Sequence, residues 1–483
     1  MKIAFLQETI NQNIGIMYLS AIVKDRGYSC ELFVKSLEKD NFFSAVLAYK
    51  PDILGFSVIT GSHHWALSTA GRLKASLSKA TVIFGGPHPT YFPEVVNKDA
   101  VDIVARGEAE LSFIEFIEKL DGGRDFSGIF GLWVKREGEV FRNDVAPLVN
   151  DISSLPHPDH NLYLKYAFYR EQTEVPFSTT RGCPYQCSFC YNHSKAKLYR
   201  GKGRFVRTRS VADVIDEMRM ARRLYSNMNT VVLYDDIIGI DKEWLDRFCA
   251  EYKKYIDMPW FTSIRPDLVN EAMVKKMAEA NCFCLSMGVE TGDEELRSKI
   301  LCKRVPDSSY IKAAQLFHKA GIKVRTSNMF FLPGEDIEKA FKTIDINRRM
   351  KSDFAWGYTL QTYPGTDIYE YSVNNGYLSP GFQFDEIDPL GLIEPTVQVK
   401  DRQKIRVLHR FFQLAIHNDF IYRMLRKIVL IPPNPIFDML YYYALVTSYA
   451  QYHKVSFLRA VSVAWSNWKE TRMEHNEPVR KSV

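Results

Sequence analysis

Short apolar runs alternate with amphipathic helical patterns along most of this 483-residue chain. Five strand-like runs with helical stretches between them fill the first 120 residues, and six further βα units follow between Val175 and Tyr369. Because parallel strands need long crossover connections, this alternation predicts an α/β protein. We expect a doubly wound Rossmann-like domain at 1–125, a linker with a β-hairpin at 126–170, a partial (β/α)6 barrel at 171–375 and a helical C-terminal region at 376–483.

The barrel strands can be placed individually. We expect them at Phe177–Thr180, Val231–Tyr234, Trp260–Ile264, Phe283–Val289, Val324–Phe331 and Ala355–Gln361. Six units make an open barrel, which can admit a bulky substrate. Chemistry in such barrels occurs at the carboxyl ends of the strands.

Three cysteines follow the first of these strands, within the sequence RGCPYQCSFCY. Cys183, Cys187 and Cys190 fit on one short loop and can bind three irons of a four-iron cluster. An electron-transfer cluster uses four cysteines, and a closed zinc site uses four ligands. The CxxxCxxC spacing therefore favours a cluster whose fourth iron is open to an outside ligand. A zinc site completed elsewhere in the chain is the alternative.

This motif, with Phe189 before its third cysteine, resembles the signature of radical S-adenosylmethionine (SAM) enzymes. The resemblance implies a [4Fe-4S] cluster on the three cysteines and SAM on the open iron. It also implies SAM contacts from polar and aromatic residues of the motif and the strand ends, namely Phe189, Tyr191, Asp235, Asp236, Ser263, Arg265, Glu290 and Asn328. Other roles stay open: Asp235 or Asp236 could cap a helix that begins near Asp241, and Arg265 could pair with Asp267 or Glu290.

The expected strand ends of the first domain carry a second pattern. Gly15 precedes Ser57 by 41 intervening residues, and Gly85-Gly86 follows Ile59 after 25. This spacing resembles the cobalamin-binding Rossmann-like domain, which implies cobalamin contacts at Gln12, Gly15, Ser57, Thr60, Gly61, Gly85, Gly86, His88 and Glu108. Gln12 stands where that family has its axial histidine, so we expect cobalt without a protein imidazole. The alternative is that these are ordinary strand-end residues of another doubly wound domain.

Positive charge is concentrated at the C-terminus, where residues 401–483 carry 13 Lys and Arg against 6 Asp and Glu. The rest of the chain is close to neutral and has no stacking motif, so we expect no nucleic-acid partner. The basic, aromatic-rich C-terminal helices could contact an anionic membrane surface, or they could pack over the barrel. The other five cysteines lie singly or in apolar contexts, as buried free thiols do in a reducing compartment. This favours a cytoplasmic location, with membrane association as a further expectation.

The two resemblances together imply a cobalamin-dependent radical SAM enzyme. The favoured function is methylation of an unactivated carbon of an apolar or natural-product-like small molecule, through a 5′-deoxyadenosyl radical and methylcobalamin. An external electron donor such as flavodoxin or ferredoxin would reduce the cluster. A cobalamin-dependent oxidative cyclase or rearrangement enzyme, without net methylation, is the alternative. A cobalamin- or redox-sensing iron–sulfur module is a third hypothesis, from another class.

Overall fold

The computed structural model describes residues 1–379, 382, 387, 395–452, 456–458 and 461. These residues fall into two compact units. The first comprises Met1–Cys284, Thr362–Tyr371 and Phe382–Pro389, and the second comprises Leu285–Gln361, Ser372–Gly381 and Leu390–Val483. In the described part of the chain, no helix is long and apolar enough to cross a membrane.

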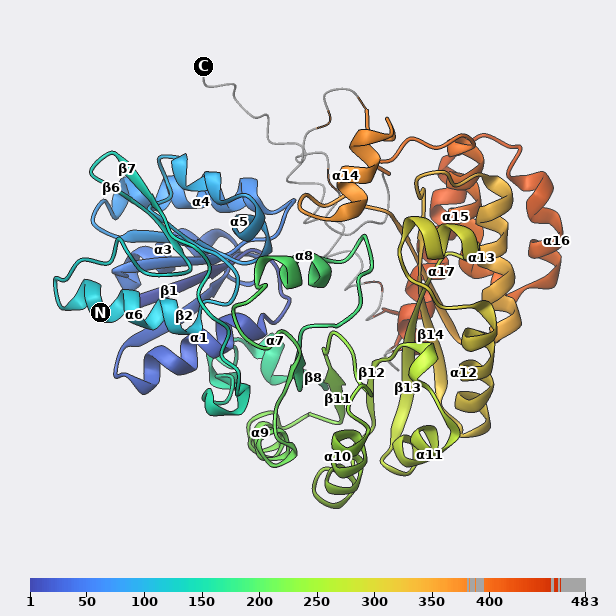
Figure 1. The fold of residues 1–483 in the computed structure, drawn as a ribbon, viewed down its shortest axis with the longest axis horizontal. Helices are drawn as coiled ribbons and strands as arrows, with labels where there is room; N and C mark the ends of the chain where they lie inside the picture. Colours follow the sequence, from blue (N-terminus) through green and yellow to red (C-terminus); the bar gives the residue numbers. More distant parts are fainter. Residues whose placement is uncertain (380–381, 383–386, 388–394, 453–455, 459–460, 462–483) are drawn as a thin grey trace. The chain divides into compact units, whose positions relative to one another are not determined.

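A seven-stranded sheet of order β2-β1-β3-β4-β5-β6-β7 forms the N-terminal part of the first unit (Figure 1). Five of its strands are parallel and match the prediction: β1 (Lys2–Gln7), β2 (Ser29–Val34), β3 (Ile53–Ser57), β4 (Thr81–Gly85) and β5 (Ile103–Ala105). The connecting helices are α1 (Ile14–Asp25), α2 (Lys35–Glu38), α3 (Phe42–Tyr49), α4 (His63–Ser76), α5 (Pro87–Tyr91) and α6 (Glu110–Asp121).

Alternate residues of the central strand β1 enter two separate cores. Ile3 and Phe5 pack with apolar side chains of α1 and α6, whereas Ala4 and Leu6 pack with those of α3 and α4. Successive side chains of a strand point to opposite faces, so an uninterrupted apolar run is buried on both sides. This packing confirms the predicted doubly wound domain.

The expected hairpin consists of β6 (Leu132–Arg136) and β7 (Glu139–Arg142). It differs from the prediction in one respect, because β6 pairs antiparallel with β5 and so continues the sheet instead of forming part of a linker. The reason is packing: Leu132 and Val134 are buried in the core formed with α1 and α6.

Three parallel strands of the predicted barrel lie in the first unit, with β11 (Thr230–Leu233) between β8 (Glu174–Phe177) and β12 (Trp260–Ser263). Their helices are α9 (Val211–Leu224), α10 (Lys242–Tyr255) and α11 (Glu271–Glu279), and the short α7 (Ala167–Arg170) precedes β8. The first strand lies earlier than the expected Phe177–Thr180. The chain leaves the sheet at Ser178 because the N–H groups of Thr179 and Thr180 bond to Asp235. Thr180–Arg181 form β9, which pairs antiparallel with β10 (Arg207–Thr208).

The remaining strands are β13 (Cys282–Glu290), which passes from the first unit into the second, β14 (Lys323–Phe330) and β15 (Phe354–Thr359). They are neighbours in that order, with β14 and β15 parallel. Helices α12 (Asp307–Lys319) and α13 (Ile337–Met350) connect them, and α14 (Asp367–Asn374) follows β15. The predicted alternation of six strands with helices is thereby confirmed.

Three C-terminal helices belong to the second unit: α15 (Arg402–His417), α16 (Asp419–Ile428) and α17 (Pro435–Tyr452). Helix α15 lies against α13 and β15. Its Ile405, Leu408 and Phe412 share a core with Phe330 and Ala355. The apolar face of α15 is therefore used for packing, which was one of the two roles expected for this region.

Candidate functional site

The cysteine loop begins at a glycine that no other residue could replace without strain. Gly182 has φ +83°, and a Cβ atom there would lie 2.4 Å from the carbonyl oxygen of Phe205. A side chain would therefore push apart the two segments that meet at β9 and β10. After the loop, the chain enters α8 (Tyr191–Leu198) directly behind the third cysteine.

Two aspartates at the end of β11 hold the entry to this loop. The carboxylate of Asp235 accepts hydrogen bonds from the backbone N–H groups of Thr179 and Thr180, at 2.6 and 2.9 Å, and from the Thr179 hydroxyl. Asp236 accepts one from the N–H of Gly182 at 2.9 Å. We predicted that this pair would contact SAM. The contacts instead give both side chains a structural task, and SAM binding by them stays a prediction.

The three cysteines lie on the short loop between β9 and α8, and their binding of a four-iron cluster stays a prediction. All are free thiols and partly exposed, and the N–H of Cys190 donates to the carbonyl of Cys187 at 3.1 Å. Burial raises the pKa of the Cys183 thiol, whereas binding to iron would deprotonate it. Within the described ranges, no three His, Cys, Asp or Glu side chains gather as ligands of a single metal ion. This finding covers the three motif cysteines as well, so it does not separate the cluster from the zinc alternative.

Beside the loop, Arg265 follows β12. Its guanidinium lies 3.7 Å from the centre of the Tyr185 ring, inside the cysteine motif, and it pairs with Asp267 at 2.9 Å. Pairing with Asp267 was one of the alternatives considered for Arg265. Ser263, which ends β12, is exposed.

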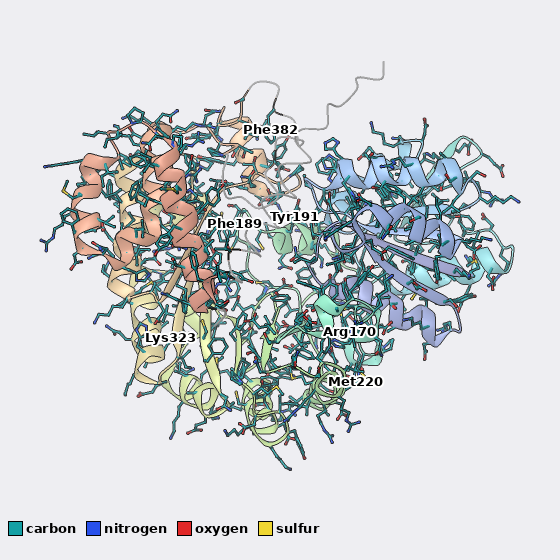
Figure 2. The ribbon with its side chains drawn as sticks, turned by 180° about the vertical axis from the view of Figure 1, so that it is seen from behind. Arg170, Phe189, Tyr191, Met220, Lys323 and Phe382 are labelled. Carbon is teal, nitrogen blue, oxygen red and sulfur yellow. The ribbon has the colours of Figure 1, made fainter. Side chains whose placement is uncertain are left out.

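Tyr191, which Figure 2 labels together with Phe189 of the same motif, contacts residues of the N-terminal domain. The ring of Tyr191 stacks on that of Tyr91 with 5.0 Å between centroids, and the Tyr91 hydroxyl donates to the Tyr191 carbonyl at 3.3 Å. The side chain of Tyr191 also shares a hydrogen bond with Thr60. Phe189, two residues earlier, is half-buried. The predicted SAM and cobalamin residues are therefore neighbours at Tyr191 and Thr60.

The strand-end loops of the N-terminal sheet come together as the spacing predicted. The Asn13 amide donates to the Ser57 hydroxyl at 2.8 Å. Gly86 has φ +96°, and a Cβ atom there would lie 2.9 Å from the backbone of Val58. Thr60 shares a 3.2 Å hydrogen bond with Nδ1 of the buried His88. A side chain at Gly86 would therefore collide with the backbone of Val58, so this position favours glycine.

The other predicted cobalamin residues lie in the same loops but differ in their surroundings. Gly15 opens α1, Gly61 precedes α4, and Gly85 ends β4. Glu108 forms ion pairs with Arg181 and Arg207, which lower the pKa of Glu108 to about 2 although burial opposes its ionisation. Cobalamin contact by Glu108 stays a prediction.

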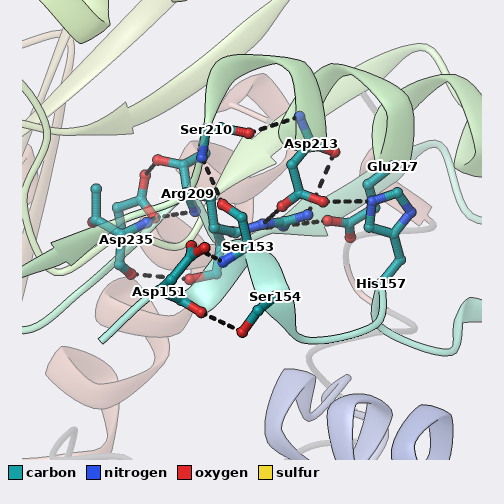
Figure 3. A network of polar contacts seen from close by, with 12 residues as sticks. Asp151, Ser153, Ser154, His157, Arg209, Ser210, Asp213, Glu217 and Asp235 are labelled. Carbon is teal, nitrogen blue, oxygen red and sulfur yellow. Dashed lines mark hydrogen bonds and ion pairs between the residues drawn. The ribbon is translucent and has the colours of Figure 1, made fainter. Parts of the chain in front are cut away.

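Gln12 is held at both ends of its amide. Its Nε2 donates to the Tyr225 hydroxyl at 3.1 Å, and its Oε1 accepts from Gln172 at 2.8 Å. Tyr225 contacts His160, which bonds to Glu217, and Glu217 pairs with Arg209. Figure 3 shows Arg209 and Glu217 in this network, beside Asp213 and His157. No sequence pattern pointed to these residues, since they come from a loop, a linker and a helix with no common spacing.

Two predicted SAM residues lie in the second unit. Glu290 ends β13 with φ +64° and pairs with Lys303 at 2.8 Å. A non-glycine residue in this region of the backbone is strained, and such strain concentrates at functional sites. The amide of Asn328 is bonded to Thr326, Asn347 and the carbonyl of Trp356, so SAM binding by Asn328 stays a prediction without support.

Two family models match the chain. The B12 binding domain matches residues 8–117, and the Radical SAM superfamily matches residues 177–346. The first match covers the strand-end loops described above, and the second covers the cysteine motif. The chain therefore contains a B12 binding domain followed by a radical SAM domain, as the two resemblances implied. These domains imply cobalamin, SAM and a [4Fe-4S] cluster as cofactors.

Among the curated proteins similar to the chain is an uncharacterized methyltransferase of Pyrococcus horikoshii, 28% identical over 381 residues and covering 77% of this chain and 80% of that protein. An anaerobic magnesium-protoporphyrin IX monomethyl ester cyclase of Rubrivivax gelatinosus is 25% identical over 371 residues, with 74% and 65% covered. Among solved structures, the radical SAM methyltransferase TsrM of Kitasatospora setae has a TM-score of 0.67 at 18% identity, with 82% of this chain and 80% of that chain covered. The likeness to the TsrM structure shows the fold of the chain.

Proposed function

Because the chain combines a B12 binding domain with a radical SAM domain, we propose that it is a cobalamin-dependent methyltransferase acting on an unactivated carbon of an apolar or natural-product-like small molecule. Methyltransferases are prominent among its curated relatives, including the Pyrococcus horikoshii protein and a bacteriochlorophyllide d methyltransferase of Chlorobaculum tepidum. The cyclase relatives support the alternative, a radical oxidative cyclase without net methylation.

One observation carries the proposal. Tyr191, directly behind the third cysteine, shares a hydrogen bond with Thr60 and stacks on Tyr91. Methyl transfer between two cofactors requires that both reach one substrate, and these contacts support adjacent sites. When bound, cluster and SAM would supply a 5′-deoxyadenosyl radical, and cobalamin would carry the methyl group.

The side chains of this protein would serve to hold and orient the cofactors. Cys183, Cys187 and Cys190 would bind the cluster, with Asp235 and Asp236 fixing the backbone that leads into their loop. The hydroxyls of Ser57 and Thr60 would bond the cobalamin nucleotide tail, and Gly86 would let the backbone approach it.

We test the proposal with anaerobically reconstituted protein that is given SAM, cobalamin and a chemical reductant. Formation of both 5′-deoxyadenosine and S-adenosylhomocysteine is expected, since a methyltransferase must cleave one SAM and take the methyl group of another. Changing the three motif cysteines to Ala should remove the iron and abolish 5′-deoxyadenosine, whereas changing the exposed Cys302 to Ala should change neither. 5′-Deoxyadenosine without S-adenosylhomocysteine would favour the cyclase alternative.

A reducing partner is part of the proposal. We expect an external donor such as flavodoxin or ferredoxin, which are acidic proteins. Arg200 and Arg204 are exposed within 14 residues of the third cysteine, and they offer positive charge close to the cluster loop. All eight cysteines are free thiols, which supports the expected cytoplasmic location.

Membrane contact is also part of the proposal. Helices α16 and α17 and the segment between them leave large apolar side chains uncovered, including Phe420 at 73% exposure, Leu430 at 69% and Ile436 at 64%. The exposed Arg423 and Lys427 lie beside them in sequence. Apolar groups flanked by cations suit a surface of anionic lipid. Co-sedimentation with phosphatidylserine vesicles, but not with phosphatidylcholine vesicles, is expected, and Leu430→Ser with Ile431→Ser should abolish it.

A further inference from the structure

A line of buried hydrogen bonds runs from the first loop of the N-terminal sheet to the segment that precedes the cluster cysteines. All of its members belong to the first unit. It begins at Gln12, passes through Tyr225, His160 and Glu217, and ends at Arg209. Gln12 is a predicted cobalamin residue, and the other four residues have no role in the proposed function.

The hydrogen atoms along this line can be assigned from the partners. Gln12 Nε2 donates to the Tyr225 oxygen at 3.1 Å, so the Tyr225 hydroxyl can donate to Nδ1 of His160 at 3.3 Å. His160 Nε2 then donates to Glu217 at 2.9 Å. Once donor and acceptor are fixed in one of these hydrogen bonds, the next group along the line can donate in one direction only. The line can therefore hold the Gln12 amide in a single orientation.

The far end of the line is anchored by charge. Glu217 pairs with Arg209, and the side chains are 1% and 2% exposed. Arg209 also donates from its guanidinium to the carbonyl of Ser178 at 3.1 Å and from its backbone N–H to that of Thr179 at 2.9 Å. A buried ion pair with such additional bonds is costly to rearrange. The Ser178–Thr179 segment leads directly to the cysteine loop.

We infer that Tyr225 and His160 are positioning residues, which orient the Gln12 amide in the cobalamin loop and tie this loop to the segment before the cluster cysteines. The inference rests on the proposed function, in which the strand-end loops of the N-terminal sheet would hold cobalamin. The Gln12 amide is thus held by Tyr225 at its Nε2 and by Gln172 at its Oε1.

Tyr225→Phe is the sharpest test, since it removes one oxygen and keeps the ring that packs edge-on against His160. Tyr252→Phe is the matched control. Its hydroxyl is bonded to the carbonyl of Met258 at 3.0 Å, its side chain is equally buried, and it lies outside the line. Hydrogen–deuterium exchange of the cobalamin-free protein should be faster at residues 8–15 in Tyr225→Phe and unchanged there in Tyr252→Phe.

The loaded protein gives a second readout. Tyr225→Phe should weaken hydroxocobalamin binding about fivefold, the effect of one lost hydrogen bond. It should also alter the electron paramagnetic resonance spectrum of the cob(II)alamin form, which Tyr252→Phe should leave unchanged. In a Gln12→Ala background, Tyr225→Phe should have no further effect on binding, because the group that it positions is gone.

Unchanged exchange at residues 8–15 in Tyr225→Phe would overturn the inference, as would equal effects of Tyr225→Phe with and without the Gln12 amide. If the unaltered protein bound no hydroxocobalamin, the proposed function would fail, and the exchange measurement would still decide whether Tyr225 holds the loop.

Discussion

Two carboxylates are buried on either side of the Ser178–Thr180 segment, and their surroundings differ. Glu217 faces cations and polar rings: Arg209 pairs with it and His160 donates to it. Asp235 faces neutral donors, namely the Thr179 hydroxyl and the N–H groups of Thr179 and Thr180. Both carboxylates are linked to the segment that enters the cysteine loop, one through Arg209 and the other directly.

The difference shows that burial alone does not set the charge of a buried acid. Burial opposes ionisation of Glu217, but the hydrogen bond from His160 and the charge of Arg209 outweigh it and lower the pKa of Glu217. At Asp235 burial prevails over three hydrogen bonds and raises the pKa to about 6. A full opposite charge can offset the loss of water, whereas neutral donors offset it only in part.

The largest expected effect comes from removing the charge of Glu217, which breaks its ion pair with Arg209. Glu217→Gln leaves the Arg209 guanidinium buried with Asp213 as its remaining acidic partner. We expect a loss of about 3–5 kcal/mol in the free energy of unfolding, as for other broken buried ion pairs. Urea denaturation at pH 7 measures it. Glu243→Gln, at an exposed position in the first turn of α10, is the control and should cost less than about 0.5 kcal/mol.

The pH dependence should separate the two acids. The folded-state pKa of Asp235 lies above its ordinary value, so the folded protein holds this proton more tightly and gains stability as the pH falls through about 6. The gain approaches about 1.4 kcal/mol for each pH unit below that point until the ordinary pKa is reached. Glu217 acts in the opposite sense, since its contribution is present above its ordinary pKa and is lost as the pH falls below it.

The measurement is the difference in unfolding free energy between the unaltered protein and Asp235→Asn at pH 7, 6 and 5. As the pH falls, the unfolding free energy of the unaltered protein should rise relative to that of Asp235→Asn. A difference that stays constant over this range would show that Asp235 does not titrate there.

At pH 7, Asp235→Asn should change stability by less than about 1 kcal/mol. The amide loses a hydrogen bond with Thr179, but it also removes a poorly compensated buried charge, and these effects oppose each other. Chemical denaturation at pH 7 tests the value. A loss as large as that of Glu217→Gln would contradict the contrast between the two sites.

The smallest effect is expected at Asp236, which is exposed and accepts one bond from the N–H of Gly182. Asp236→Asn keeps an oxygen for this bond, so stability should change by about 0.5 kcal/mol or less. Iron content after reconstitution should stay within about a tenth of that of the unaltered protein. A large loss of iron from Asp236→Asn alone would give this residue a more direct part in the cluster site.

The structure agrees with the sequence most closely where a pattern is local. The five parallel strands of the first sheet and the six of the barrel region follow from apolar runs between helical patterns. The cysteine motif and the glycines at 85–86 follow from their spacing. The prediction was wrong at the start of the barrel, since Ser178–Thr180 leave the sheet. No local sequence pattern indicates that Asp235, at the end of a strand some 55 residues later, bonds to the backbone of this segment.

The amino-acid sequence by itself determined the order of the two domains, the three thiols on one loop and the absence of a histidine at position 12. These properties need only residue identity and local geometry. The tertiary structure decided which polar groups become partners. It placed Asp235 against the backbone at Thr179, Tyr225 between Gln12 and His160, and Lys303 beside Glu290. Each of these pairings depends on burial, because a polar group taken out of water must find its partner wherever the packed chain brings one.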